Sequence, residues 1–137
     1  MATQQQIVDF FAAEFPHSNC TIEAIGRRSA VVRYAVREAD LRPGGTVSGP
    51  ALMATADVAL YVAILGTIGI VPLTVTTSFN INFLRKPAAG CDIIAECKLL
   101  KVGKALVVGE VTLYSVGNDD AVAHAVGTYS IPKNEVT

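Results

Sequence analysis

The residue in this sequence with the clearest capacity for chemistry is Asp57. It is the only charged residue among the 42 that separate Arg42 from Arg85, so that stretch holds no cation to neutralise it. An ionised carboxylate retained in apolar surroundings is a candidate general base. The same pattern also fits a structural aspartate that caps a neighbouring segment or pairs with a distant basic side chain.

A glycine-containing segment at residues 44–50, with the sequence GGTVSGP, could supply the second part of a catalytic site. Ser48 or Gly49 can cap a helix that has Pro50 in its first turn. Free N–H groups and the positive end of the helix dipole meet at such a start, which suits a developing oxyanion. Glycine-containing helix starts are common, so the segment indicates catalysis only together with Asp57, two turns further along.

Both candidate groups lie on one long apolar helix. Residues 51–65 are almost entirely apolar and Gly66 is a suitable C-terminal cap, so we expect the helix to end there and to be buried on most sides. The run 51–73 is also long enough to span a membrane. We favour a core helix, because Asp57 would sit well inside the bilayer and Pro72 interrupts the run.

Shorter elements surround this helix. Thr3 and Gln6 have capping-box spacing before a short amphipathic helix that Pro16 ends. Strand-like stretches lie at residues 20–25, 30–37, 73–83, 92–101, 105–114 and 121–129.

Period-two alternation in the third stretch places Val75, Thr77 and Phe79 on one face and Thr76 on the other. The turn signals between the last four strands predict a meander. The fold class is therefore α+β, with a largely antiparallel sheet wrapped around one long central helix.

Composition narrows the class of protein. A chain of 137 residues is expected to form one domain, 1–137, and its apolar content of 51% favours a homo-oligomer. A net charge of −1 gives no attraction for nucleic acid or an anionic membrane, so neither is expected as a partner. Three scattered cysteines and an N-terminus without a signal pattern predict a cytoplasmic protein. His17 and His124 lack companions at ligand spacing, so no metal or other cofactor is expected.

Two motifs carry a family resemblance. The stretch GGTVSGPALMATAD at residues 44–57, followed by TTSFNINFLRKP at residues 76–87, resembles the phenylacetate-pathway (PaaI-like) branch of the hotdog-fold acyl-CoA thioesterases. The order of elements from about residue 21 to residue 132 agrees with that family. The resemblance implies a hotdog fold and a homodimer whose sheets join edge to edge, often pairing into a homotetramer with active sites between subunits.

The resemblance also implies roles for individual residues. Asp57 matches the catalytic carboxylate, which acts as general base toward water or as nucleophile. Gly49 matches the glycine whose N–H polarises the thioester carbonyl. Thr76 matches a Ser or Thr that positions the attacking water from the neighbouring subunit, although strand parity leaves Thr77 as a competitor.

The chain departs from the family at the helix start, where Ser48-Gly49-Pro50 replaces the His-Gly-Gly of many members, and at Arg42, which takes the place of an asparagine carbonyl donor. Substrate contacts are expected from Arg42, Ser48, Thr77, Asn80, Arg85, Lys86 and Lys104. The cations among them would bind CoA phosphates, although basic residues at strand ends are also common on solvated surfaces.

Our leading hypothesis is hydrolysis of an acyl-CoA thioester to a free carboxylic acid and CoA. The first alternative is a non-catalytic acyl-CoA-binding or sensing protein, in which the changes at Ser48, Pro50 and Arg42 have removed the chemistry. A hotdog hydratase or dehydratase ranks last, because neither His17 nor His124 lies in the loop that leads into the long helix.

Overall fold

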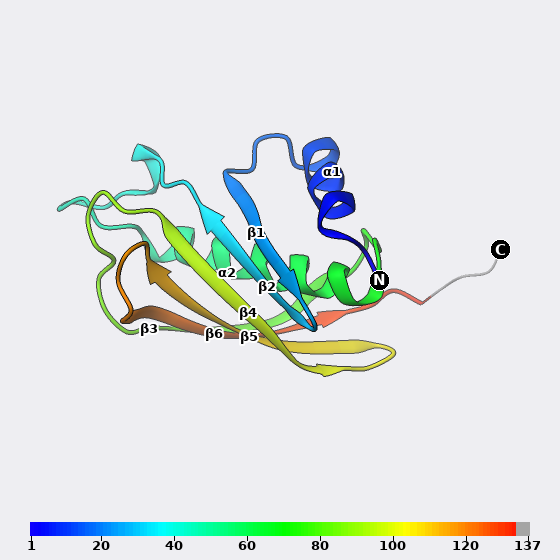
Figure 1. Cartoon of the computed structure of the whole chain (residues 1–137). Coiled ribbons are helices and arrows are strands. Elements are labelled where there is room, and N and C mark those ends of the chain that lie inside the picture. The colour runs from blue at the N-terminus through cyan, green and yellow to red at the C-terminus, as the bar shows by residue number, and fades with distance from the viewer. Residues whose placement is uncertain (134–137) are drawn as a thin grey trace.

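The computed structural model describes residues 1–133, and its elements follow the expected order (Figure 1). Along the chain they are α1 (Gln4–Glu14), β1 (Cys20–Gly26), β2 (Ser29–Tyr34), the 3₁₀ turn η1 (Glu38–Asp40), α2 (Gly49–Ile68), β3 (Val75–Phe83), β4 (Ile93–Val102), β5 (Leu106–Ser115) and β6 (Ala121–Ser130). The second strand ends three residues earlier than predicted, since the chain turns into η1 after Tyr34.

The six strands form one antiparallel sheet in the order β1-β2-β4-β5-β6-β3. The predicted meander is confirmed for β4, β5 and β6 and is wrong for β3, which pairs with β6 at the edge of the sheet. A tight hairpin needs a loop of about 2–5 residues. Residues 84–92 between β3 and β4 are a longer connection, which lets β4 return beside β2.

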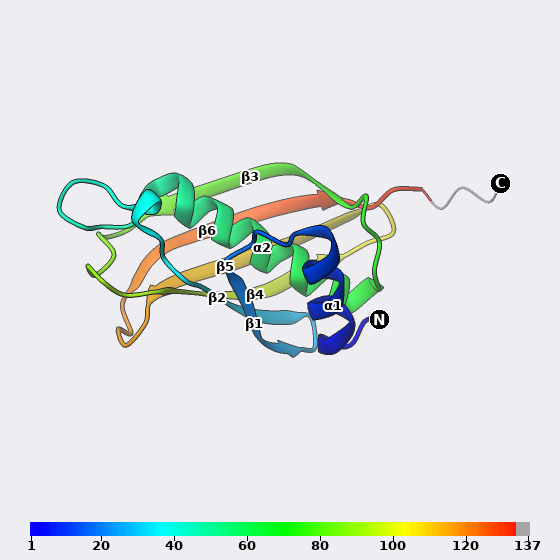
Figure 2. The same cartoon turned by 90° about the horizontal axis from the view of Figure 1, so that it is seen from above.

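The long helix α2 lies across the concave face of this sheet (Figure 2). Ten of its 20 residues are buried, and they form the core with inward-facing side chains of the strands. The other side of its first half is open, with Met53 42% exposed. Within residues 1–133, α2 is the one helix long and apolar enough to cross a membrane, and here its apolar side chains form the core. The hotdog arrangement expected from the sequence is confirmed.

The predicted start of α2 is confirmed, whereas its predicted end is wrong. Of the two predicted caps, Ser48 and Gly49, Ser48 is the N-cap, and its hydroxyl accepts a hydrogen bond from the Ala51 N–H at 3.3 Å. The predicted end at Gly66 is wrong, because the helix continues to Ile68 and Gly69 caps it with a φ of 101°. The glycine at 66 serves packing instead: a Cβ there would lie 3.1 Å from Cγ2 of Ile25 on β1.

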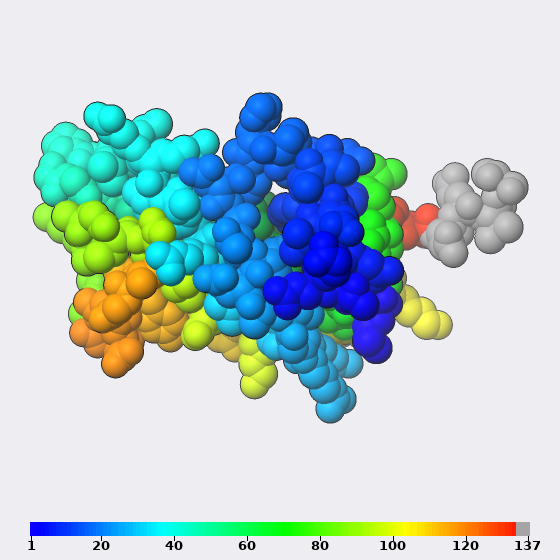
Figure 3. Space-filling model, turned by 45° about the horizontal axis from the view of Figure 1, so that its top comes forward, coloured from blue at the N-terminus to red at the C-terminus, as the bar shows by residue number. Residues whose placement is uncertain are grey.

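Helix α1 closes one end of the molecule. Its predicted capping box is present, since the Gln6 N–H donates to Thr3 Oγ1 at 3.1 Å and the Thr3 N–H donates to Gln6 Oε1 at 2.9 Å. The Gln4 side chain donates to the Ile22 carbonyl, which ties α1 to β1. In the space-filling view α1, in dark blue, covers the end of the molecule that contains the C-terminal part of α2 (Figure 3).

Candidate active site

Asp57 is half-buried on α2, and one of its two carboxylate oxygens is held firmly. Its Oδ1 accepts hydrogen bonds from the Tyr129 hydroxyl at 2.6 Å and the Thr76 hydroxyl at 2.9 Å. No hydrogen bond from residues 1–133 reaches Oδ2. The carboxylate therefore has one anchored oxygen and one oxygen available to a ligand.

A β-bulge in β3 decides between Thr76 and Thr77. Thr76 is opposite Tyr129 on β6 and Ser78 is opposite Thr128, so Thr77 is the extra residue and the parity of the strand changes there. Thr76 thus shares the inward face with Phe79, which corrects the face predicted from simple alternation. The Thr77 hydroxyl instead donates to the Thr128 carbonyl at 3.3 Å. Thr76 lies beside Asp57 of its own chain and needs no neighbouring subunit to reach it.

An open, largely apolar pocket of about 470 Å³ adjoins the Asp57 carboxylate. Its walls come from α1 and the loop after it, from α2, from β6, and from the start of β3 with the segment before it. They consist of Phe11, Phe15, Ser18, Asp57, Val58, Tyr61, Pro72, Thr74, Val75, Thr76 and Tyr129. Asp57 is the only acidic or basic side chain in this lining, so the pocket suits an uncharged apolar group.

The predicted oxyanion donor lies in a different pocket, of about 440 Å³. Gly49 is the first residue of α2, and its N–H has no hydrogen-bond partner within residues 1–133. This pocket, which we call the cationic pocket, brings together Gly49 with the predicted substrate residues Arg42, Arg85 and Lys86. The Arg85 guanidinium also donates to the Ala121 carbonyl at 2.9 Å.

Within one chain, Gly49 and Asp57 do not face a common ligand. Eight residues of α-helix separate them by about 12 Å along the axis and by roughly a quarter of a turn around it. The pocket beside Asp57 and the cationic pocket share no lining residue. Gly49 and Asp57 of one chain therefore line two separate pockets, and their roles as oxyanion donor and base stay predictions.

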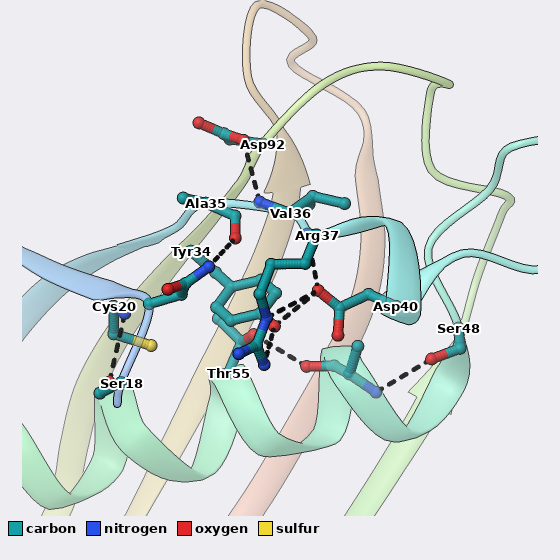
Figure 4. A network of polar contacts seen from close by, with 12 residues as sticks. Ser18, Cys20, Tyr34, Ala35, Val36, Arg37, Asp40, Ser48, Thr55 and Asp92 are labelled. Atoms are coloured by element: carbon teal, nitrogen blue, oxygen red, sulfur yellow. Dashed lines mark hydrogen bonds and ion pairs between the residues drawn. The ribbon is translucent and has the colours of Figure 1, made fainter. Parts of the chain in front are cut away.

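A polar network fixes the start of α2. The Tyr34 hydroxyl donates to Asp40 Oδ2 at 2.6 Å, and the same oxygen accepts from the Arg37 N–H at 2.8 Å. The Asp40 carbonyl accepts from the Ser48 N–H at 2.8 Å. Figure 4 shows these residues gathered over the first turns of α2. The Ser48 side chain, predicted to contact substrate, acts here as a helix cap beside this network.

Like Ser48 and Thr77, the predicted substrate residues Asn80 and Lys104 line neither of these two pockets. Asn80 is on the outer face of β3, opposite Val126 and away from α2. Lys104 is in the β4–β5 turn, at the other end of the sheet from Arg85. Within residues 1–133 no group of three His, Cys, Asp or Glu side chains could hold a metal ion. His124 instead contacts Glu110, with Nε2 and Oε1 3.0 Å apart.

Tyr129 is the site residue that sequence reasoning missed. The inward face of β6 carries Ala123, Ala125, Gly127 and then Tyr129, all buried. A tyrosine on an inward face usually finds a partner for its hydroxyl, so this alternation is a signal that could have identified it. Burial, and then the hydrogen bond to Asp57, raise the pKa of Tyr129. Its phenol therefore remains a neutral donor.

This chain is similar in sequence and structure to known thioesterases. The family model of the thioesterase superfamily matches residues 44–122. A candidate thioesterase from Silicibacter sp. TM1040 is 39% identical, with 95% of this chain and 92% of that chain aligned at a TM-score of 0.88. No curated protein matches this chain.

Two further solved structures support the fold. The PaaI protein from the phenylacetic acid degradation operon of E. coli is 20% identical, covers 98% of this chain and 96% of its own, and has a TM-score of 0.82. A hypothetical thioesterase from Streptococcus pneumoniae TIGR4, solved with coenzyme A, is also 20% identical, with coverages of 95% and 99% and a TM-score of 0.74.

Proposed function

This chain belongs to the thioesterase superfamily and is of the PaaI-like hotdog type, and from that premise we propose that it hydrolyses an acyl-CoA thioester to a free carboxylic acid and CoA. The observation that carries the proposal is the Asp57 carboxylate, which is anchored at Oδ1 and open at Oδ2 on the wall of an apolar pocket. The coenzyme A bound to the Streptococcus pneumoniae protein supports CoA as the thiol portion.

In the proposed reaction the acyl group occupies the apolar pocket, with its carbonyl carbon near Asp57 Oδ2. As general base, Asp57 takes a proton from a water molecule while the water oxygen bonds to the carbonyl carbon. The carbonyl electron pair moves onto oxygen and returns as the C–S bond breaks. CoA then leaves as a thiolate and takes up a proton. If Asp57 is instead the nucleophile, its oxygen bonds to the carbonyl carbon and the C–S bond breaks, so that CoA leaves as a thiolate that takes up a proton. Water then hydrolyses the resulting mixed anhydride to the free acid and the Asp57 carboxylate.

The oxyanion donor in this proposal is Gly49 of a second copy of the chain. Asp57 and Gly49 of one chain line separate pockets. In a homodimer with two-fold symmetry, Asp57 of one copy would face Gly49 of the other. The edge strand β3 favours such pairing. It is nine residues long, carries no charge and exposes apolar side chains, with Val75 at 54% and Phe83 at 53%.

The opposite edge of the sheet is protected. Strand β1 has a bulge between Ile22 and Ala24, and the Gln4 side chain of α1 occupies the Ile22 carbonyl. We therefore propose a homodimer formed through β3; pairing of two dimers into a tetramer stays a prediction. A cytoplasmic location is also part of the proposal, and it rests on the sequence alone.

CoA phosphates would bind at the cationic pocket. Arg42, Arg85 and Lys86 surround the N-terminus of α2, where the helix dipole adds to their charge. Lys104 is not part of this proposed phosphate site, because it lies at the other end of the sheet in the same chain.

The direct test is thiol release from a panel of acyl-CoA thioesters. We expect the purified protein to release one free thiol per acid formed from at least one uncharged acyl-CoA, followed with a thiol reagent and by chromatography of the acid. Tight acyl-CoA binding with no release from any member of the panel would contradict hydrolysis and favour the acyl-CoA-binding alternative.

A complementation experiment tests the shared site. Gly49→Pro removes one N–H at the first helical position, where proline is well accepted, and should lower kcat by about 10²-fold. The matched control is Gly49→Ala, which adds a Cβ near Phe83 but keeps the N–H. Mixed with Asp57→Asn, the proline variant should recover about a quarter of wild-type activity, because half the dimers then contain one intact site of two.

A mixture that stays as inactive as either variant alone would contradict the shared site. In that case each chain would need both residues for itself, and every site in a mixed dimer would carry one defect. Co-expression with two different affinity tags provides the mixed species in pure form. The alanine control must keep most of its activity for loss of the N–H to explain the effect of proline.

A further inference from the structure

We propose that Tyr129 is a positioning residue for Asp57, which fixes Oδ1 so that Oδ2 faces the acyl pocket. This inference rests on the proposed hydrolysis and adds to it a residue that catalyses nothing itself. It is carried by the short contact between the Tyr129 hydroxyl and Oδ1, at 2.6 Å, and by the burial of the ring, which is 3% exposed.

The Tyr129 hydroxyl touches Asp57 twice. It lies 2.6 Å from Oδ1 and 3.0 Å from the main-chain carbonyl of the same residue. A phenol has one hydrogen to donate, and the shorter distance assigns it to Oδ1. The position of the hydroxyl between the side chain and the main chain of Asp57 restricts rotation of the carboxylate about its own Cα–Cβ bond.

The second donor to Oδ1 is the Thr76 hydroxyl, which is held in place less firmly than the Tyr129 hydroxyl. In the single chain its side chain is exposed on the edge strand β3, so the packing of its own chain does not hold its hydroxyl in place. The Tyr129 ring is instead held inside the sheet and stacked against Tyr61, with ring centroids 6.1 Å apart. A donor fixed by packing in a low-dielectric site makes a stronger hydrogen bond to a charge than an exposed donor does.

The surroundings of Asp57 leave Tyr129 as the buried hydrogen-bond donor to its carboxylate among the residues that the structure describes. From β6 it faces Tyr129, and from β3 it faces Thr76, which does not titrate. From α2 the pocket contributes Tyr61, and from α1 and its C-cap it contributes Phe11 and Phe15. Burial, and then the negative charge of Glu14 at the end of α1, raise the pKa of Tyr61. Glu14 itself does not line the pocket. No cation lines this pocket, so no nearby positive charge would compensate for the loss of a hydrogen-bond donor to the carboxylate.

The test is the pH profile of Tyr129→Phe, which removes the hydroxyl and keeps the ring. We expect the acid limb of kcat/KM, measured on the best acyl-CoA of the panel, to move up by about one pH unit. At neutral pH kcat should fall about 10-fold while KM changes little, because the apolar pocket keeps its shape. Thr76→Val should give a smaller shift in the same direction.

Tyr114→Phe is the matched control, since it removes a phenol on β5 that makes no hydrogen bond within residues 1–133. It should reproduce the wild-type profile. If Tyr129→Phe loses stability or kcat but keeps the wild-type acid limb, Tyr129 is only structural and the inference is overturned. A wild-type protein that hydrolyses no thioester would overturn the proposed function, and this inference with it.

Discussion

Asp57→Asn is expected to lower kcat for acyl-CoA hydrolysis by about 10³-fold with little change in KM. The amide oxygen of asparagine can still accept hydrogen bonds from Tyr129 and Thr76 in place of Oδ1. The amide nitrogen would then face the pocket, and it can neither take a proton from water nor attack a carbonyl. Both possible roles of Asp57 are lost while the shape of the site remains.

The measurement is steady-state thiol release together with acyl-CoA affinity from calorimetry. Affinity should be kept, because asparagine preserves the shape of the apolar pocket and the cationic pocket is untouched. Asp119→Asn is the control, since it makes the same change of charge in the exposed β5–β6 turn. Turnover in Asp57→Asn equal to that of wild type would rule out Asp57 as base or nucleophile.

The elements that local chemistry determines could be predicted from the sequence. The start of α2 follows from the capping residue Ser48 and from Pro50 in the first turn, and both occupy their predicted places. The capping box of α1 was readable for the same reason. Asp57 was found because a single charge in a long apolar run is visible without any knowledge of contacts.

Features set by contacts distant in sequence could not be predicted. The bulge at Thr77 depends on pairing with β6, about 50 residues later, and it decides which threonine meets Asp57. Glycine is typical of a helix end, but at position 66 it lies within the helix and leaves space for the side chain of Ile25 on β1. The separation of Gly49 from Asp57 into two pockets depends on which strands flank each part of α2.

Leu60→Ala is expected to lower the free energy of unfolding by about 2–5 kcal/mol. Leu60 is fully buried on α2, and its two methyl groups fit against paired glycines of the sheet. A Cβ at Gly109 would lie 2.6 Å from Leu60 Cδ2, and a Cβ at Gly127 would lie 2.6 Å from Cδ1. Because both methyls are confined, Leu60 cannot rotate away from a new methyl on either strand.

Gly127→Ala should therefore destabilise by overpacking, by about 1–3 kcal/mol. Combined with Leu60→Ala it should cost less than the sum of the two changes, by about 1 kcal/mol or more, since the smaller side chain leaves room for the new methyl. Urea unfolding at one fixed protein concentration measures these free energies. Leu100→Ala, at a half-exposed position on β4, is the control and should cost little. Strict additivity would contradict the packing account.

The same contact also sets the geometry of the candidate site. Asp57 lies three residues before Leu60 on α2, and Tyr129 lies two residues after Gly127 on β6. A methyl at Gly127 that pushes α2 away from β6 must also lengthen the 2.6 Å contact between Tyr129 and Asp57. Gly127→Ala should thus lower kcat as well as stability. Addition of Leu60→Ala should restore part of both, which ties the packing of α2 directly to the chemistry at Asp57.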